Sequence, residues 1–239
     1  MYEQFAMIYD EMMEEIPYDE WFAMLQRILQ EKGIRTGHIC ELGCGTGEMV
    51  RRFAEAGYEV TGIDLSPDML AKASEKTLGM ENILYFEQNM TDFSLHKPAD
   101  VVLCICDSMN YLLSKEELQS MFRCIKEALT ENGVAVLDMK TAYCFQKVMG
   151  NQTRVDETED ALMIWDNTYD EAAHINEYLL TIFTEDKATG MYERYDECHQ
   201  QRAYTEEEVK ECLNEASLRV VKSWTEEQVR TYFVVQNAE

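Results

Sequence analysis

The sequence predicts an α/β fold in which a mainly parallel sheet carries an inserted antiparallel β-rich cap. Three observations lead to this class. Strand and helix patterns alternate over residues 38–139, a glycine-rich turn joins the first strand to the first following helix, and strand patterns without a long helix fill residues 153–202. Alternating β and α units form parallel sheets because each helix returns across one face of the sheet with a right-handed connection.

Apolar spacing and capping signals define the elements of the first part. Residues 1–32 show helical spacing of their apolar side chains. Further helices are predicted to begin after Ser66 and after Ser114, where Glu117 completes a capping box. The second of these is expected to end at Asn132-Gly133. The predicted strands are His38–Leu42, Glu59–Leu65, Ile83–Asn89, Asp100–Cys106 and Val134–Met139.

The second part begins with β-forming residues and returns to the α/β pattern near residue 203. Residues 186–190 have the composition of a hairpin turn between two strands. A capping box at Thr205 and Glu208 then predicts a helix, and two closing strands are predicted at Leu218–Trp224 and Val229–Val235.

These patterns predict two domains. The first combines residues 1–142 with residues 203–239 and carries an N-terminal helical lid of residues 1–32. The second is the β-rich cap of residues 143–202. The insertion leaves from the carboxyl end of the sheet, where ligands bind in open α/β folds, so we expect the cap to roof the site.

Composition limits the possible partners and the compartment. The chain of 239 residues has 46 acidic and 21 basic residues and a net charge of −25, which disfavours nucleic acid as a partner. No apolar run reaches the roughly 20 residues that span a membrane, and the first residues lack the pattern of a signal peptide. The eight cysteines lie mostly within strand and helix patterns, and no C-x-x-C pair suggests a metal site. We expect a cytoplasmic protein without metal.

Residues 41–47 form the glycine-rich turn, Glu-Leu-Gly-Cys-Gly-Thr-Gly. Glycines permit a sharp turn and a close approach of ligand to backbone, but their spacing differs from the G-x-G-x-x-G of dinucleotide sites. Glu41 would repel a pyrophosphate and attract an amine. Asp64, at the end of the second strand, can accept hydrogen bonds from two ribose hydroxyls. The pattern favours an adenosine ligand that carries an amino acid in place of phosphates.

This turn resembles the first motif, [DE]-x-G-x-G-x-G, of class I S-adenosylmethionine (SAM)-dependent methyltransferases. Tyr2–Asp10, Asp107–Leu112 and Tyr192–His199 also resemble segments of small bacterial methyltransferases of mostly unassigned substrate. The resemblance covers essentially the whole chain. It implies a Rossmann-like seven-stranded methyltransferase sheet with an inserted antiparallel β cap, SAM as cofactor, and methyl transfer to a small-molecule acceptor between core and cap.

The resemblance also implies roles for individual residues. Asn89 stands where the family often carries Asp, so an uncharged amide oxygen would meet the adenine amine. Tyr9 would close over the cofactor, and Asp64 would hold the ribose. The cofactor contacts are expected at Tyr9, Glu41, Gly43, Gly45, Asp64, Leu65, Asn89, Met90 and Cys106, and the substrate pocket at Asn110, Tyr111 and Arg194.

Catalysis would need few groups because SAM is an activated donor. The protein has to align a nucleophile about 3 Å from the methyl group and exclude water. Glu197 and His199 lie two apart on a strand pattern and share a face, so they are candidates for an orienting acid and a catalytic base. A surface pair on an acidic cap is the alternative. Trp165 is expected in the core.

Other functions remain compatible with these patterns. The chain could be a catalytically inactive SAM-binding or protein-interaction module, since a glycine turn alone does not establish turnover. A nicotinamide oxidoreductase is disfavoured by the glycine spacing and by Glu41. The net charge favours a neutral or cationic acceptor, and the protein is expected to be a monomer or homodimer.

Overall fold

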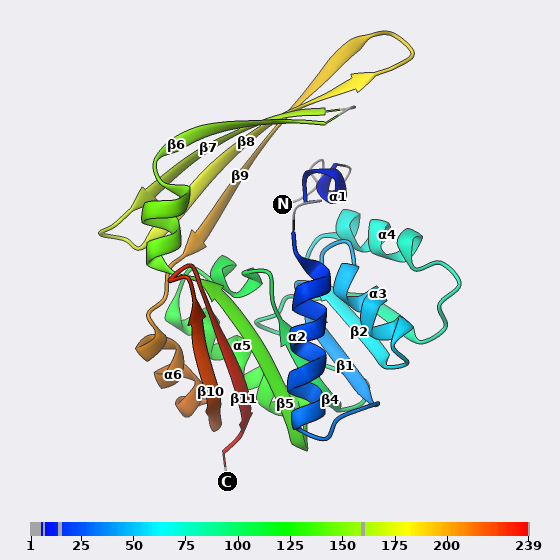
Figure 1. The fold of residues 1–239 in the computed structure, drawn as a ribbon, viewed down its shortest axis with the longest axis vertical. Coiled ribbons are helices and arrows are strands. Elements are labelled where there is room, and N and C mark those ends of the chain that lie inside the picture. Colours follow the sequence, from blue (N-terminus) through cyan, green and yellow to red (C-terminus); the bar gives the residue numbers. More distant parts are fainter. Residues whose placement is uncertain (1–5, 7, 14–15, 159–160, 239) are drawn as a thin grey trace.

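The computed structural model describes residues 6, 8–13, 16–158 and 161–238, and these residues form two sheets (Figure 1). The larger sheet has seven strands in the order β10-β11-β5-β4-β1-β2-β3. Its strands are β1 (His38–Leu42), β2 (Glu59–Asp64), β3 (Ile83–Glu87), β4 (Ala99–Cys104), β5 (Leu129–Lys140), β10 (Leu218–Glu226) and β11 (Arg230–Asn237). β3, β2, β1, β4 and β5 run parallel, and β11 pairs antiparallel with β5. The predicted Rossmann-like methyltransferase sheet is confirmed.

Helices cover both faces of this sheet. α5 (Lys115–Ala128) and α6 (Glu206–Glu215) pack on one face around Phe122 and Leu213. α2 (Tyr18–Glu31), α3 (Glu48–Glu55) and α4 (Pro67–Lys76) contribute to the cluster on the other face around Leu25 and Phe53. The capping signals at Ser66, Ser114 and Thr205 are confirmed, and the last two are complete capping boxes.

The second sheet is antiparallel and has the order β6-β7-β8-β9. Its strands are β6 (Gln152–Glu157), β7 (Ala161–Asp170), β8 (Ile175–Asp186) and β9 (Met191–Arg202). The predicted turn at residues 186–190 is confirmed, because the N–H groups of Thr189 and Gly190 donate to the Asp186 carbonyl. The β8–β9 hairpin extends beyond the rest of the sheet (Figure 1). Facing the core, the second sheet packs against Ile8 and the short helix α1 (Tyr9–Met12).

The structure corrects two details of the sequence prediction. Helix α5 ends at Ala128, not at Asn132-Gly133, because Leu129 already has extended backbone angles and pairs with Ala99 of β4. Strand β6 and a π-helical turn, η3 (Cys144–Met149), were not predicted. In the N-terminal helical stretch, α2 begins directly after Pro17, where the sequence resumes its helical spacing, so this expectation is confirmed. Part of that stretch, at residues 1–5, 7 and 14–15, lies outside the described residues.

Candidate active site

A cavity of about 540 Å³ lies between the two sheets. The glycine turn after β1 and the carboxyl ends of β2 and β4 line it on the core side. Trp165 of β7 and Tyr178 of β8 line it on the side of the second sheet, and Tyr9 and Trp21 line it from the N-terminal segment. The cavity therefore brings together residues from three separate parts of the chain.

The glycine turn has a backbone that only glycine adopts readily. Gly43 and Gly47 have φ angles of +65° and +77°. A Cβ atom at Gly43 would lie 2.6 Å from the Ser108 hydroxyl oxygen, and one at Gly47 would lie 2.6 Å from the Tyr85 hydroxyl oxygen. Both positions therefore require glycine for space as well as for backbone angle. The turn leaves the backbone of Gly43 and Gly45 exposed to the cavity.

Asp64 fixes the shape of this turn. Its two carboxylate oxygens accept hydrogen bonds from the N–H of Gly45 at 2.8 Å and of Ser66 at 2.9 Å. Burial raises the pKa of Asp64, and these backbone donors oppose that rise. Each oxygen can accept a further bond, so Asp64 can hold the turn and still meet a hydroxyl group in the cavity.

Glu41 is a buried acid at the edge of the cavity. Its side chain is 4% exposed, and its Oε2 has no hydrogen-bond partner among the described residues. Burial, and then the nearby Asp64 charge, raise the pKa of Glu41 to about 8. A buried carboxyl without a cation beside it is costly to ionise, so this position suits a ligand that brings positive charge.

The residues predicted at the adenine edge lie along the cavity, but only some of them already have hydrogen-bond partners within the protein. Leu65 is 61% exposed and, with Met90, lines the cavity. The amide oxygen of Asn89 accepts hydrogen bonds from the backbone N–H and the hydroxyl of Thr91, both at 2.9 Å. Asn89 therefore shapes its own loop, and its oxygen is already occupied by two donors.

A cluster of buried charges that sequence reasoning missed supports the turn after β4. Cys106 and Asp107 both have left-handed backbone angles, with φ of 59° and 56°. The Asp138 carboxylate accepts from both of their N–H groups, at 3.2 and 2.7 Å. Arg230 binds Asp107 and Asp138 at 2.8 Å each, and Lys140 binds Asp107 at 2.9 Å. Asp138, an acid within the otherwise apolar pattern of β5, was the feature of the sequence that could have indicated this cluster.

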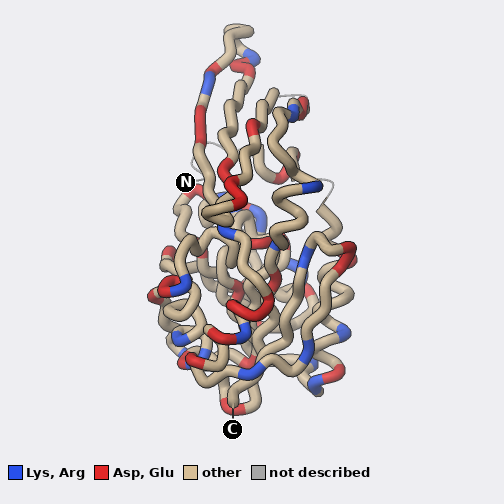
Figure 2. The backbone as a smooth tube through the Cα atoms, turned by 90° about the vertical axis from the view of Figure 1, so that its left-hand side faces the viewer, with Lys and Arg blue, Asp and Glu red and all other residues tan. Residues whose placement is uncertain are grey.

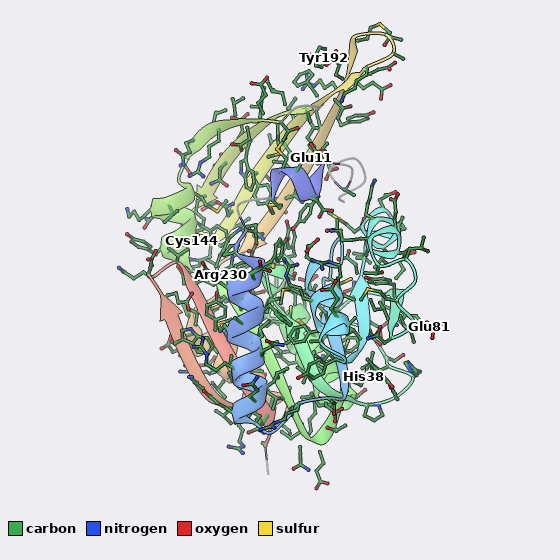
Figure 3. The ribbon with its side chains drawn as sticks, turned by 45° about the vertical axis from the view of Figure 1, so that its right-hand side comes forward. Glu11, His38, Glu81, Cys144, Tyr192 and Arg230 are labelled. Carbon is green, nitrogen blue, oxygen red and sulfur yellow. The ribbon has the colours of Figure 1, made fainter. Side chains whose placement is uncertain are left out.

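These contacts determine the ionisation of Asp107. Burial would raise its pKa, but the positive charges of Lys140 and Arg230 outweigh burial and lower the pKa to about 2. Arg230 also lies over the Trp21 ring, with its guanidinium carbon 5.1 Å from the ring centroid. Figure 3 shows Arg230 beside the upper end of α2. The cluster thus ties the last strand to the floor of the cavity.

Tyr111 lies where the sequence predicted it, on the cavity wall. It ends the short 3-10 helix η2 (Ser108–Tyr111), and its hydroxyl oxygen is 2.5 Å from that of Tyr178. Ser108, at the start of the same turn, donates from its hydroxyl to the Gly43 carbonyl at 3.3 Å. One 3-10 turn therefore touches both the glycine turn and the second sheet.

The other two residues that the sequence predicted in the substrate pocket lie away from the cavity. Asn110 is fully buried, and its amide binds the backbone of Lys140 and Arg202 at 2.8–3.1 Å. Arg194 is an exposed residue of β9 that pairs with Asp196 at 2.8 Å. Neither residue lines the cavity. Asn110 joins η2 to β5 and β9, because its short amide can satisfy both of those backbones at once.

His199 and Glu197 do share a face, as predicted, but Tyr178 stands beside them at the cavity. His199 Nε2 lies 3.1 Å from Glu197 Oε2, and the His199 side chain is fully buried. Its ring stacks on the Tyr178 ring at a centroid distance of 5.1 Å. Of the residues the structure describes, Tyr178 and Trp165 line the cavity from the second sheet, whereas His199 and Glu197 do not. Trp165, expected in the core, belongs to the cavity wall.

The N-terminal segment closes one side of the cavity. Asp10 of α1 accepts a hydrogen bond from the Thr46 hydroxyl at 2.6 Å and pairs with Lys76 at 2.7 Å. Ile8 and Met12, on the same segment, pack against the second sheet. The segment therefore contacts both the glycine turn and the second sheet. No group of three or more metal-ligating side chains occurs within residues 6, 8–13, 16–158 and 161–238.

Comparison with known proteins supports the same reading of the fold and the glycine turn. The methyltransferase domain family matches residues 39–133. A Geobacillus sp. (strain WCH70) protein, named as a presumed methyltransferase, is 38% identical over 92% of this chain and 90% of its own length. The presumed methyltransferase YqeM of Bacillus subtilis is 34% identical over 92% of this chain and 87% of its own.

Solved structures agree at the level of the fold. A SAM-dependent methyltransferase from Clostridium acetobutylicum has a TM-score of 0.87 with 23% identity, and the match covers 100% of this chain and 99% of that one. DesVI of Streptomyces venezuelae has a TM-score of 0.81 with 19% identity, over 98% of both chains. The nearly full-length relatives show that the chain belongs to the methyltransferase family, and the solved structures show that it has the fold of class I SAM-dependent methyltransferases.

Proposed function

We propose that this enzyme transfers a methyl group from SAM to a small-molecule amine held between the seven-stranded sheet and the second sheet. The observation that carries the proposal is a single cavity lined both by the glycine turn and by Trp165 and Tyr178 of the second sheet. Residues 143–202 then act as a cap and residues 1–32 as a lid on a core of residues 1–142 and 203–239.

The proposed cofactor site uses the core side of this cavity. Bound SAM supplies a methyl group activated by its sulfonium charge. Asp64 accepts hydrogen bonds from the ribose hydroxyls while it keeps its bonds to the turn. Glu41 faces the positive charge of the methionine end with its buried oxygen. The remaining proposed contacts are the backbone of Gly43, Gly45 and Cys106 and the side chains of Tyr9, Leu65, Asn89 and Met90.

An amine is the favoured acceptor because of the charges around the cavity. Its lining includes six acids, Glu41, Glu48, Asp64, Asp68, Asp107 and Glu117, but of the basic side chains in the described ranges only Lys140 and Arg230. Both of these cations are paired with Asp107. Glu41 is largely protonated below pH 8, and Glu48 is paired with Arg52 and Lys76. The remaining negative charge comes from Asp64, Asp68 and Glu117, and it attracts a cationic amine and disfavours an anionic acceptor.

The names of partial relatives point in the same direction. A protein of Parasynechococcus marenigrum named as a glycine/sarcosine N-methyltransferase is 29% identical over 47% of this chain. A Streptomyces fradiae protein named as an N,N-dimethyltransferase of a dTDP-linked amino sugar is 26% identical over 51%. Both names describe transfer to an amine nitrogen. These matches cover about half of the chain, so they support the type of acceptor atom and not a particular acceptor.

The decisive experiment measures formation of S-adenosylhomocysteine with a panel of small primary and secondary amines, with the corresponding alcohols as controls. Turnover that depends on an amine supports the proposal. Tight SAM binding without turnover on any acceptor would favour the alternative, an inactive SAM-binding module.

The proposal that Asp64 binds the ribose of SAM is tested separately by the substitution Asp64→Ala. Losing charge-assisted hydrogen bonds to two hydroxyls is expected to weaken SAM binding by about 1.5–3 kcal/mol in calorimetry. Because Asp64 also holds the turn, Asp64→Asn, which keeps one acceptor oxygen, checks that the effect is not misfolding. Glu81→Ala, which removes an exposed carboxylate far from the cavity (Figure 3), is the control. Unchanged SAM affinity in a folded Asp64→Ala protein would rule out this ribose contact.

A further inference from the structure

We propose that the hydroxyl pair of Tyr111 and Tyr178 is the part of the enzyme that holds the acceptor nitrogen during methyl transfer. In the same proposal, His199 and Glu197 act through the two tyrosine rings, as positioning residues, because the His199 ring contacts both Tyr178 and Tyr111. This inference rests on the proposed function, and it replaces the sequence-based expectation that His199 removes a proton from the acceptor.

The two tyrosines meet across the boundary between the sheets. Tyr111 comes from η2, which follows β4 of the core, and Tyr178 comes from β8 of the second sheet. Their hydroxyl oxygens are 2.5 Å apart, and both side chains line the cavity. A phenol oxygen can accept two hydrogen bonds and donate one, so a bonded pair can still receive an N–H from a ligand.

The pair lies close to the proposed cofactor site. Ser108 and Tyr111 are the two ends of η2, and Ser108 donates to the Gly43 carbonyl of the glycine turn. A 3-10 helix rises about 2 Å per residue, so these two residues are only about 6 Å apart along its axis. An acceptor bound at the hydroxyl pair would therefore be next to a cofactor on the glycine turn.

Tyr178 is held firmly in a row of three aromatic side chains. Trp165 of β7 stacks on one side at a centroid distance of 4.7 Å, and His199 of β9 stacks at 5.1 Å. His199 is the direct cross-strand neighbour of Tyr178. Glu197 in turn contacts His199 Nε2 at 3.1 Å. Stacked cross-strand neighbours fix the orientation of a ring, so the row sets the position of the Tyr178 hydroxyl.

His199 is poorly placed to take a proton itself. Its side chain is fully buried, and it does not line the cavity, whereas Tyr178 does. A general base has to reach the proton that it removes, directly or through one water. The contacts of His199 with Tyr178 and Tyr111 are contacts between rings, at centroid distances of 5.1 and 6.1 Å, and position the two phenols.

An amine acceptor does not need such a base at the moment of transfer. An amine that arrives as a cation first releases one proton to water, which leaves its nitrogen lone pair free. The neutral nitrogen then uses this lone pair to form the new N–C bond while the C–S bond of SAM breaks, and the positive charge moves from sulfur to nitrogen. The extra proton then leaves the methylated nitrogen to water. The phenol oxygens accept the N–H of the acceptor and aim its lone pair at the methyl group, and the Trp165 ring, which also lines the cavity, stabilises the developing cation.

The test compares Tyr111→Phe and Tyr178→Phe with Tyr192→Phe, which makes the same change at the exposed end of the β8–β9 hairpin (Figure 3). With an amine that the wild type methylates, each of the first two variants is expected to lose about 10- to 100-fold in kcat/KM. The double variant is expected to lose little more than either single one, because the hydroxyls act as a unit. SAM affinity should stay within about twofold. Tyr192→Phe should match the wild type.

His199→Phe separates positioning from base catalysis, because phenylalanine keeps the stack on Tyr178 and removes the ring nitrogens. We expect it to keep most of kcat and the wild-type pH profile, whereas loss of a true base costs about 10²–10⁴ in turnover. His199→Gln, which lacks the ring, should raise KM more than it lowers kcat.

Two results would overturn the inference. One is wild-type kcat/KM in Tyr178→Phe, even if its melting temperature falls, since the hydroxyl would then be only structural. The other is loss of turnover and of the acid limb of the pH profile in a folded His199→Phe protein. A wild type that binds SAM but methylates no amine would instead overturn the proposed function, and the inference with it.

Discussion

Glu41 is a residue of the proposed cofactor site whose carboxyl departs far from its ordinary behaviour. Its carboxyl is buried, one oxygen has no partner among the described residues, and its pKa is raised to about 8. An unfolded glutamate has a pKa near 4.3. Between these values the folded protein holds a proton that the unfolded chain releases. This group's contribution to stability is therefore complete below about pH 4.3 and is lost as the pH rises through about 8.

The first prediction concerns the pH dependence of SAM binding. If the positive methionine end requires ionised Glu41, the apparent Kd is expected to tighten by about 20-fold between pH 6.5 and 8.5, since protonation competes with binding below pH 8. Calorimetry across this range measures the effect. Glu41→Gln is the matched control and should remove most of the dependence. An equally steep pH dependence in Glu41→Gln would show that another group, such as the amine of SAM, is responsible.

At the scale of single residues, the sequence indicated which side chains gather but not always which one faces the ligand. The alternation of β9 placed Glu197 and His199 on one face, and the structure has them there. It did not reveal that Tyr178 stands beside His199, because that contact depends on the register between β8 and β9. Likewise, the occupied oxygen of Asn89 follows from a local turn to Thr91 that its position alone did not indicate.

Strand β11 stabilises the cavity floor through a single arginine. Arg230 has a side chain 14% exposed and joins Asp107 to Asp138, the acids that hold the left-handed turn at Cys106. Arg230→Met is expected to lower the free energy of unfolding by about 3–5 kcal/mol, because two buried carboxylates lose their shared cation. Urea denaturation measures this. Arg230→Lys should cost less because it keeps the charge.

Arg194→Met is the control for that experiment. It also removes an arginine from an aspartate pair, but Arg194 and Asp196 are both about 60% exposed. Such pairs contribute little because water screens them, so we expect no resolvable change in the free energy of unfolding. Equal effects of the two substitutions would contradict the structural role given to Arg230.

The same cluster makes stability depend on pH in the wild type. Asp107 has its pKa lowered to about 2, so its ionised carboxylate contributes to the free energy of unfolding above about pH 4. This contribution is lost as the pH falls towards 2.

Among the elements, those with local signals were predictable and those that depend on distant partners were not. Capping residues located the starts of α4, α5 and α6, and the apolar pattern located β1 at His38–Leu42, where the structure has it. The end of α5 was wrong because pairing with β4 draws Leu129 into a strand. Strand β6 is exposed along its whole length, so it lacks the apolar alternation that would have indicated it.

Over the whole molecule, the N-terminal segment connects the two sheets. Ile8 and Met12 pack on the second sheet, while Asp10 binds Thr46 and Lys76 of the core. Because this segment closes over the cavity, we expect SAM to leave more slowly than it would from an open site.

The charge of the molecule is also spread widely. Acidic side chains occur along much of the chain, including both strands of the β8–β9 hairpin (Figure 2).

Because Asp10 ties the N-terminal segment to the core, we expect Asp10→Ala to increase the dissociation rate of SAM by about two- to fivefold. The change is small because Asp10 is 47% exposed and a screened ion pair contributes at most about 1 kcal/mol. Stopped-flow displacement of bound cofactor measures this rate. Glu55→Ala, which breaks an exposed pair with Arg51 on α3, is the control and should leave the rate unchanged. A rate unchanged in Asp10→Ala would mean that this contact does not hold the lid closed.

The most direct test of the whole account is a crystal structure of the protein with S-adenosylhomocysteine. We expect the ligand on the glycine turn, with both ribose hydroxyls within hydrogen-bonding distance of Asp64 and the sulfur atom directed at the hydroxyls of Tyr111 and Tyr178. A ligand bound away from the turn, or one whose sulfur faces away from the second sheet, would contradict the proposal that the acceptor binds between the two sheets.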